Sequence, residues 1–299
     1  MNARIFAAAA IAATTLALAA HTDAQQPAAP SPEKQRMTAL GVEHGTARAL
    51  YEHFKKEANN GRALTWASVP DWTGIWTREA TPLFWDPDQG SPTALPTAKL
   101  TPEHERLLRD KLDKVNRGIE FDPLSNCEPA GMPRWLVEPF LKEFVVTPAQ
   151  TYLINEMQNE IRRVYTDGRD HPSEADAYPL WEGDSIGFWD GDKLVIHTSQ
   201  MRAGQYQRIQ PFYTEQVETV EIWEKPDPTT MVVHVWAFDP PALAEPWYTK
   251  QVYKQLSNDD LSLRIRYWHC GENPNNAVEQ SDTGTSDFSN FTFTHKDDR

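Results

Sequence analysis

Residues 142–165, KEFVVTPAQTYLINEMQNEIRRVY, decide the fold that this sequence predicts. Short runs rich in β-branched and aromatic residues are typical of strands, and Thr147-Pro148-Ala149 separates the first two runs as a hairpin loop does. We therefore predict three consecutive strands at residues 142–147, 151–157 and 160–166. Successive side chains of a strand point to opposite faces of the sheet, so each strand can turn one face to a core and one to solvent.

The same pattern of short strands and turns continues along the chain. Further strands are predicted at residues 185–189, 193–199, 216–225, 230–238, 248–255 and 261–269. The turn signals between strands include Asp167-Gly168, Asp190-Gly191-Asp192, Pro226-Asp227-Pro228 and Asn258-Asp259. No helical pattern separates these strands, which argues against parallel βαβ units. We predict a mostly β fold, an antiparallel up-and-down, lipocalin-like barrel of about eight to ten strands that encloses a small-molecule site. A flattened sandwich is the alternative.

The residues before the barrel divide into two segments. Residues 1–24 combine a short basic start, an apolar run and small residues ahead of Gln25, which predicts a cleavable signal peptide and a periplasmic or secreted protein. An uncleaved anchor is the alternative. Residues 25–68 read as a Pro- and Ala-rich tether followed by one or two helices that pack on the outside of the main body. The barrel domain then takes residues 69–299 and opens with a strand within 71–76.

One helix is inserted in the barrel domain, at residues 101–117. Thr101 suits its N-cap, Pro102 its first helical position, and leucines recur at helical spacing after them. The helix therefore interrupts the strand pattern once, between the first predicted strand and residue 142.

Charge and cysteine content limit the classes of partner. The net charge of −14 disfavours a nucleic-acid partner and an anionic membrane surface, and no segment predicts stable membrane insertion. Cys127 and Cys270 are the only cysteines, so an exported chain could join them in a disulfide or keep two buried thiols. No spacing of His and Cys indicates a metal site, and no sequence signature indicates a cofactor. The oligomeric state is left open.

Candidate substrate-binding residues lie on the strand pair at 151–165. If the pair ran without a bulge, Asn159, Arg163 and Tyr165 would share one face with apolar neighbours, while the charged face with Arg162 would meet water. A guanidinium and an amide inside a barrel suit an oriented carboxylate or phenol. The alternative pairs Arg163 with an acidic neighbour on the rim.

Candidate catalytic residues come from two loops. Asp167 and His171 are close enough in sequence to pair as a general base, although Asp167 also suits an ordinary turn. His269 and Glu272 offer a second imidazole and carboxylate, although the same stretch also reads as a strand end fixed by Cys270. Glu218 lies on an apolar strand face, where a carboxylate would have a raised pKa and could bind substrate or act as an acid. A salt bridge to a cross-strand Arg or Lys is the alternative for Glu218.

Two function classes remain after these observations. One is a cofactor-independent lyase, isomerase or hydrolase that acts on a small aromatic or apolar molecule by acid–base catalysis. The other is a carrier of an apolar ligand, which needs only an apolar lumen. A surface or structural partner domain is a third option. Because the Gly-x-Ser-x-Gly elbow is missing, an α/β-hydrolase is disfavoured.

Several motifs together resemble a group of uncharacterised exported bacterial proteins. They are the segments 122–134 (DPLSNCEPAGMPR), 159–172 (NEIRRVYTDGRDHP), 185–195 (SIGFWDGDKLV) and 270–273 (CGEN), and the similarity covers about residues 71–273. The sequence departs from that group at residues 197–202. Residues 72–76 also look like the Gly-x-Trp opening of lipocalin-type barrels. The resemblance implies export and a lipocalin-like barrel, and it implies no reaction.

Overall fold

The structure, a computed structural model, describes residues 30–79, 84–89, 97–119, 122–173, 175–256, 264–270, 279–280 and 286–287. The predicted signal peptide at 1–24 and the candidate Glu272 lie outside the described residues. Among the helices of the described residues, none combines the length and the apolar character needed to cross a bilayer.

Nine strands form a closed barrel, in the order β1-β11-β10-β9-β6-β5-β4-β3-β2. They are β1 (Ile75–Arg78), β2 (Lys142–Val146), β3 (Gln150–Asn155), β4 (Glu160–Tyr165), β5 (Asp184–Asp190), β6 (Lys193–Ser199), β9 (Glu218–Asp227), β10 (Thr230–Phe238) and β11 (Trp247–Gln255). Two small hairpins add β7 (Gly204–Gln205), β8 (Phe212–Tyr213), β12 (Glu279–Gln280) and β13 (Ser286–Asp287). The predicted mostly β barrel with additional helices is confirmed.

The barrel strands follow one another in chain order, and one neighbouring pair is parallel. With nine strands, directions cannot alternate all the way round a closed ring, so at least one pair must run the same way. That pair is β4 and β5, where Val164 lies beside Ser185 and Tyr165 beside Ile186. The predicted antiparallel arrangement holds for the other neighbouring pairs of the barrel, and β4–β5 is the exception. The connection from β4 to β5 must cross from one end of the barrel to the other, and it carries His171.

The barrel interior is packed with large aromatic side chains. The buried aromatic residues of this core are Trp72, Trp76, Trp85, Trp135, Phe144, Trp189, Tyr206, Tyr213, Trp223, Trp247 and Tyr253. Their rings pack edge-to-face or stacked, as between Trp72 and Trp189 (5.1 Å) and between Trp223 and Tyr253 (5.7 Å). Edge-to-face and stacked rings add stability beyond the area that they bury. Much of the aromatic content of the sequence therefore serves the core.

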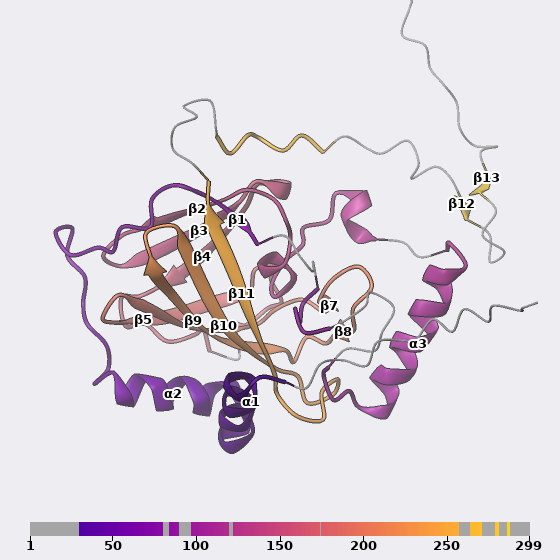
Figure 1. Ribbon diagram of the computed structural model, residues 1–299, viewed down its shortest axis with the longest axis horizontal. Coiled ribbons are helices and arrows are strands. Elements are labelled where there is room, and N and C mark those ends of the chain that lie inside the picture. Colours follow the sequence, from indigo (N-terminus) through magenta and orange to yellow (C-terminus); the bar gives the residue numbers. More distant parts are fainter. Residues whose placement is uncertain are drawn as a thin grey trace, which may run out of the picture.

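Two helices cover part of the outside of the barrel, as predicted. Helix α1 (Pro32–His44) starts at the N-cap Ser31, and α2 (Ala47–Glu57) starts at the N-cap Thr46. Figure 1 shows both helices on the same side of the barrel. Apolar side chains of α2 meet outward-facing side chains of β5, β6, β9, β10 and β11 and form a second core. Leu50 and Tyr51 carry this contact on the helix, because they lie on the face that the barrel covers.

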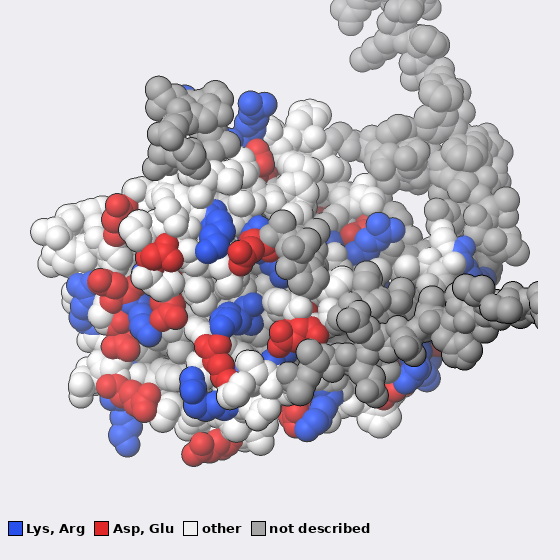
Figure 2. Space-filling view, in the orientation of Figure 1, with Lys and Arg blue, Asp and Glu red and all other residues white. Residues whose placement is uncertain are grey.

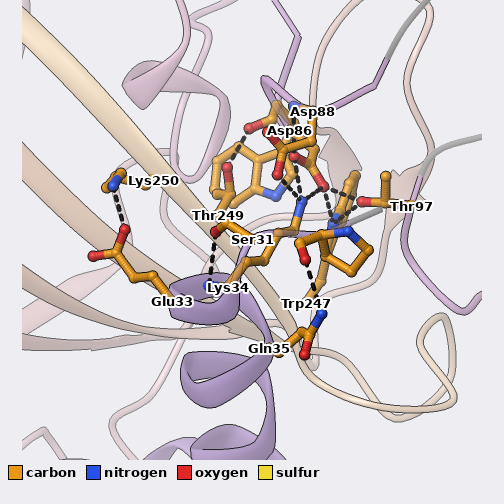
Figure 3. Close-up of polar contacts among 12 residues, drawn as sticks. Ser31, Glu33, Lys34, Gln35, Asp86, Asp88, Thr97, Trp247, Thr249 and Lys250 are labelled. Atoms are coloured by element: carbon orange, nitrogen blue, oxygen red, sulfur yellow. Dashed lines mark hydrogen bonds and ion pairs between the residues drawn. The ribbon is translucent and has the colours of Figure 1, made fainter. Parts of the chain in front are cut away.

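The start of α1 is fastened by a buried carboxylate, which Figure 3 shows. The ammonium group of Lys34 donates to both oxygens of Asp86 at 2.7 and 2.5 Å and to the more exposed Asp88 at 2.9 Å. The Asp86 carboxylate also accepts from the hydroxyl of Thr97 and, at 3.3 Å, from the indole of Trp247. The 84–89 segment is thereby tied to both α1 and the barrel.

We expect Asp86→Asn to lower the free energy of unfolding by about 1–3 kcal/mol, because hydrogen bonds to a buried charged group are lost. Urea denaturation checks this. Asp88→Asn is the matched control, since that carboxylate pairs with the same lysine at 49% side-chain exposure and should change stability by less than about 1 kcal/mol. Equal losses in the two variants would contradict the anchoring role of Asp86.

The inserted helix lies where the sequence predicted it, as α3 (Pro102–Asn116). Pro102 takes the first helical position, but the hydroxyl of Thr101 donates to the carbonyl oxygen of Pro241 (2.9 Å) and does not cap the helix. In Figure 1 this helix lies apart from α1 and α2, on the side of the β7–β8 hairpin.

The predicted strand at 261–269 is wrong over the residues that the structure describes there. Residues 264–270 do not pair with a barrel strand, because β1 already pairs with both β11 and β2 and closes the barrel. The segment instead crosses the β3–β4 turn, where the Asn159 amide exchanges hydrogen bonds with the backbone of Trp268 at 2.9 Å. Cys127 and Cys270 form a disulfide with a Cα–Cα distance of 5.8 Å, which settles the alternative of two free thiols.

Candidate acid-base site at one end of the barrel

The inward face of β4 is the opposite of the predicted one. Arg162 is fully buried inside the barrel, whereas Arg163 is exposed on the outer face. The cause is the turn between β3 and β4, η3 (Met157–Asn159), in which Gln158 and Asn159 both take a left-handed φ of 56°. This turn ends the alternation after Asn155, and the hairpin pairs Asn155 directly with Glu160, so both point inward. A change of one position in register moves every side chain to the other face.

Arg162 forms a complete set of hydrogen bonds inside the barrel. Its guanidinium pairs with both oxygens of the fully buried Glu221 at 2.9 and 2.7 Å, from β4 across to β9. It also donates to the hydroxyls of Ser185 (3.1 Å) and Thr198 (2.7 Å). The Glu221 carboxylate accepts further from the indole of Trp223 at 2.9 Å. Because every charge is matched, we interpret this pair as structural.

Next to this pair lies a second polar group, built around a buried lysine. Lys142 of β2 has no exposed surface, and its ammonium donates to the carbonyl oxygen of Glu138 (3.0 Å) and to Asn155 (3.4 Å). The Asn155 amide donates in turn to Glu160 (3.0 Å). Burial lowers the pKa of Lys142 to about 8, although the carboxylates of Glu138 and Glu160 oppose that change. The ammonium also lies 4.5 Å from the ring centre of Trp135.

Glu160 and Glu182 add two carboxyl groups with raised pKa values. Burial raises the pKa of Glu160, against hydrogen bonds from the backbone of Gly131 and from Asn155. Burial and then the nearby Glu160 carboxylate raise the pKa of Glu182 well above its ordinary value. The Glu182 carboxyl is shielded from solvent and interacts with the Glu160 carboxyl, although other atoms of this residue are partly exposed. Burial next to a second carboxylate favours the protonated form of Glu182.

The same end of the barrel holds further buried polar atoms without partners. Within the described part of the chain they are the indole nitrogens of Trp85 and Trp135, the hydroxyl of Tyr206, the amide nitrogen of Gln205 and the amide of Gln210. The Tyr206 ring packs against Trp85 (4.9 Å) and Tyr213 (5.2 Å), and the charges of Arg134, Glu182 and Glu160 act on the Tyr213 hydroxyl. Buried polar atoms normally find a protein or water partner, so each of these atoms can still form a hydrogen bond to water or to a ligand.

The structure separates the two predicted catalytic partners Asp167 and His171. Asp167 accepts from its neighbour Arg169 (2.6 Å), whose guanidinium lies 4.1 Å from the ring centre of the half-buried Tyr165. His171 turns the other way, with Nδ1 2.5 Å from Asp184 and Nε2 2.9 Å from Nδ1 of His197. The predicted pairing of Asp167 with His171 is therefore wrong.

The other predicted residues are also outside the barrel interior. Glu218 lies 2.9 Å from Nε2 of His197, and His197 in turn contacts His171. The sequence did not predict His197 as a partner of either residue. His269 is exposed on the 264–270 segment, and Asn159 bonds to the backbone of that same segment. None of the predicted residues that the structure describes lies in the group formed by Lys142, Glu160 and Glu182.

Sequence reasoning missed the three interior residues for physical reasons. Charged residues in strands normally face water, and the alternation placed Glu160 on the water-facing side of its strand. One signal was present, because Lys142 precedes an apolar alternation in which Phe144 and Val146 would share its face. Glu182 lies in a loop, and only the fold brings it beside Glu160.

Charge on the surface is mixed. Figure 2 shows acidic and basic side chains interspersed on the visible face, without a basic patch. Among the residues that the structure describes, no three His, Cys, Asp or Glu side chains gather in a way that could hold a metal ion. Comparison with protein-family models and with curated proteins finds no match. The function is therefore inferred from the buried side chains at this end of the barrel.

Proposed function

We propose that this protein is an exported small-molecule-binding β-barrel that catalyses proton transfer without a cofactor, at the end of the barrel where Lys142, Glu160 and Glu182 meet. The barrel itself is compatible with ligand binding. The residues 1–24 pattern and the disulfide support export, because disulfides persist in oxidising compartments. The reaction class is a lyase, isomerase or hydrolase reaction on a small molecule that is partly aromatic.

The observation that carries this proposal is the state of Glu182. Two carboxyl groups buried side by side cost stability, and carboxyl pairs with raised pKa values are typical of acid–base sites. A raised pKa lets Glu182 hold its proton at a higher pH than an ordinary carboxyl and makes it a stronger base once ionised, and these are the two roles of a general acid–base group. Glu160 maintains the raised pKa by its charge, and Lys142 balances that charge.

Aromatic residues support a substrate with an unsaturated ring. Trp135 and Tyr213 lie beside the charged group, and Tyr206 and Trp85 extend the same aromatic cluster and carry donors without a partner among the described residues. Rings offer stacking and edge contacts to a planar molecule, and the indole and phenol donors could bind its polar substituents. An apolar carrier remains the alternative function, and it would not need Glu182.

We expect Glu182→Gln to retain ligand binding and to lose about 100-fold or more in turnover, because the amide keeps the shape of the carboxyl but cannot donate or accept the proton. A thermal-shift screen of aromatic acids, phenols and amides on the mature protein first identifies a ligand, and turnover of that ligand is then followed by chromatography. Glu215→Gln, on an exposed loop carboxylate, is the matched control. Ligand binding with no turnover in the wild type would favour the carrier, and equal turnover in both variants would remove Glu182 from the site.

A further inference from the structure

Four side chains on the outer face of the barrel form a continuous chain of polar contacts. Asp184 Oδ1 lies 2.5 Å from Nδ1 of His171, Nε2 of His171 lies 2.9 Å from Nδ1 of His197, and Nε2 of His197 lies 2.9 Å from Oε2 of Glu218. The four residues come from the β4–β5 connection and from β5, β6 and β9. Both imidazoles are mostly shielded, with side-chain exposures of 12% for His171 and 3% for His197.

The three contacts of this chain require one more proton than two neutral imidazoles carry. Each of the three contacts needs a proton between its two heavy atoms, because two lone pairs at these distances repel. A neutral imidazole has one N–H, so two neutral histidines supply two protons for three contacts. The third proton must be taken up from solvent, whether it is assigned to a nitrogen or to a carboxylate oxygen. The two carboxylates at the ends of the chain stabilise that additional positive charge.

The additional proton belongs on His171. Burial lowers the pKa of His197, against the opposing effect of the Glu218 carboxylate, so His197 prefers the neutral form. His171 lies between the Asp184 carboxylate and the acceptor nitrogen of His197, where a cation can donate in both directions. A cationic His171 with a neutral His197 satisfies all three contacts and leaves both end carboxylates ionised.

This chain is mechanically connected to helix α2. The backbone N–H of His171 donates to Asp170 (2.8 Å), and Asp170 accepts two hydrogen bonds from Arg48 of α2 at 2.6 and 3.1 Å. The Tyr51 ring of the same helix lies 5.6 Å from the ring of His197. If the contact between the imidazoles breaks, His171 keeps only its contact with Asp184, and the neighbouring Asp170 is held less firmly beside Arg48 of α2.

Other charged or titratable groups lie near the chain, but none of them supplies its third proton. They are Arg48, Tyr51 and Glu52 from α2, Asp170 and Arg169 from the β4–β5 connection, and the chain's own Asp184 and Glu218. Burial raises the pKa of the Tyr51 hydroxyl, so it stays neutral. Arg48 and Arg169 are themselves paired with Asp170 and Asp167, so their charges are largely compensated.

We propose that the Asp184–His171–His197–Glu218 chain is a one-proton latch that fastens helix α2 and the 166–173 segment to the barrel and opens when the proton leaves. A group that binds its proton more tightly in the folded protein contributes stability at low pH and loses it as the pH rises. The latch is therefore closed while the chain holds its third proton and opens when a rise in pH removes that proton. It is independent of the acid–base site, because no residue is shared.

The first test counts the protons directly. In protein labelled with 15N-histidine, NMR near pH 6.5 should show three protonated ring nitrogens across His171 and His197. Two neutral imidazoles, with one N–H each, would overturn the proposal. This measurement needs no substitution, so it stands even if a variant fails to fold.

The second test follows helix α2 by hydrogen–deuterium exchange of the full mature chain at several pH values, corrected for the intrinsic rates. After division by the intrinsic rate at each pH, the amides of residues 47–57 are expected to exchange about tenfold faster at pH 9 than at pH 6.5. The reason is the loss of one charge-assisted hydrogen bond. His171→Gln should exchange fast at both pH values, and Asp184→Asn should move the transition to lower pH. His269→Gln, an exposed imidazole elsewhere, should behave like the wild type.

One competing source of pH dependence lies on α2 itself. His53 is 3.5 Å from Glu57 on the same helix, so its titration could also change the helix. His53→Gln should keep the transition if the latch causes it. A transition that disappears in His53→Gln but persists in His171→Gln would overturn the proposal.

Discussion

Arg162→Met is expected to lower the free energy of unfolding by about 3–5 kcal/mol, because it leaves the Glu221 carboxylate buried without its counter-ion. Both side chains are fully buried, and the guanidinium supplies two of the hydrogen bonds that satisfy that carboxylate. The hydroxyls of Ser185 and Thr198 lose a donor in the same change. Urea denaturation followed by tryptophan fluorescence measures the effect.

The neighbouring arginine supplies a matched control. Arg163→Met removes the same group one residue along β4, on the exposed face, and should change stability by no more than about 0.5 kcal/mol. The double variant Arg162→Met with Glu221→Gln should recover part of the loss, since no unpaired charge remains inside. Equal denaturation midpoints for the two single variants would show that Arg162 is not the inward residue and would contradict the register of β4.

These two arginines also show how far the sequence could predict the structure. Alternation and turn residues were enough to predict a closed barrel, its N-terminal helices and its inserted helix, because these patterns are local. The face of β4 depended on the turn before it. Two non-glycine residues with positive φ at Gln158 and Asn159 are uncommon, and no sequence pattern required them. One turn thus decided whether Arg162 or Arg163 lies inside.

The candidate site was harder to predict than the fold for a different reason. His171 and His197 are 26 residues apart, and Glu160 and Glu182 meet across a parallel strand pair. The sequence indicated that His171 and Glu218 were chemically notable, and the structure does connect them, but through His197. Contacts of that kind depend on the order and register of strands that are far apart in the chain, which local patterns do not encode.

Removing the disulfide is the second change with a large expected effect. The Cys127–Cys270 bond closes a loop of 143 residues, and the simple chain-entropy treatment assigns about 5 kcal/mol to a loop of that length. Measured losses for native disulfides are about 2–5 kcal/mol. The loop contains every barrel strand except β1, so the bond restricts the unfolded chain over most of the barrel.

We therefore expect the double variant Cys127→Ser with Cys270→Ser to unfold at a clearly lower urea concentration than the oxidised wild type, by about 2–5 kcal/mol. The wild type with dithiothreitol should match the variant. Trp268→Ala separates the two possible causes, because it removes the packing of this segment on Phe140 (5.0 Å) and leaves the covalent bond. A loss in Trp268→Ala as large as that in the cysteine variant would assign the stability to local contacts of the 264–270 segment. Equal midpoints for oxidised and reduced wild-type protein would show that the bond adds no stability to the barrel.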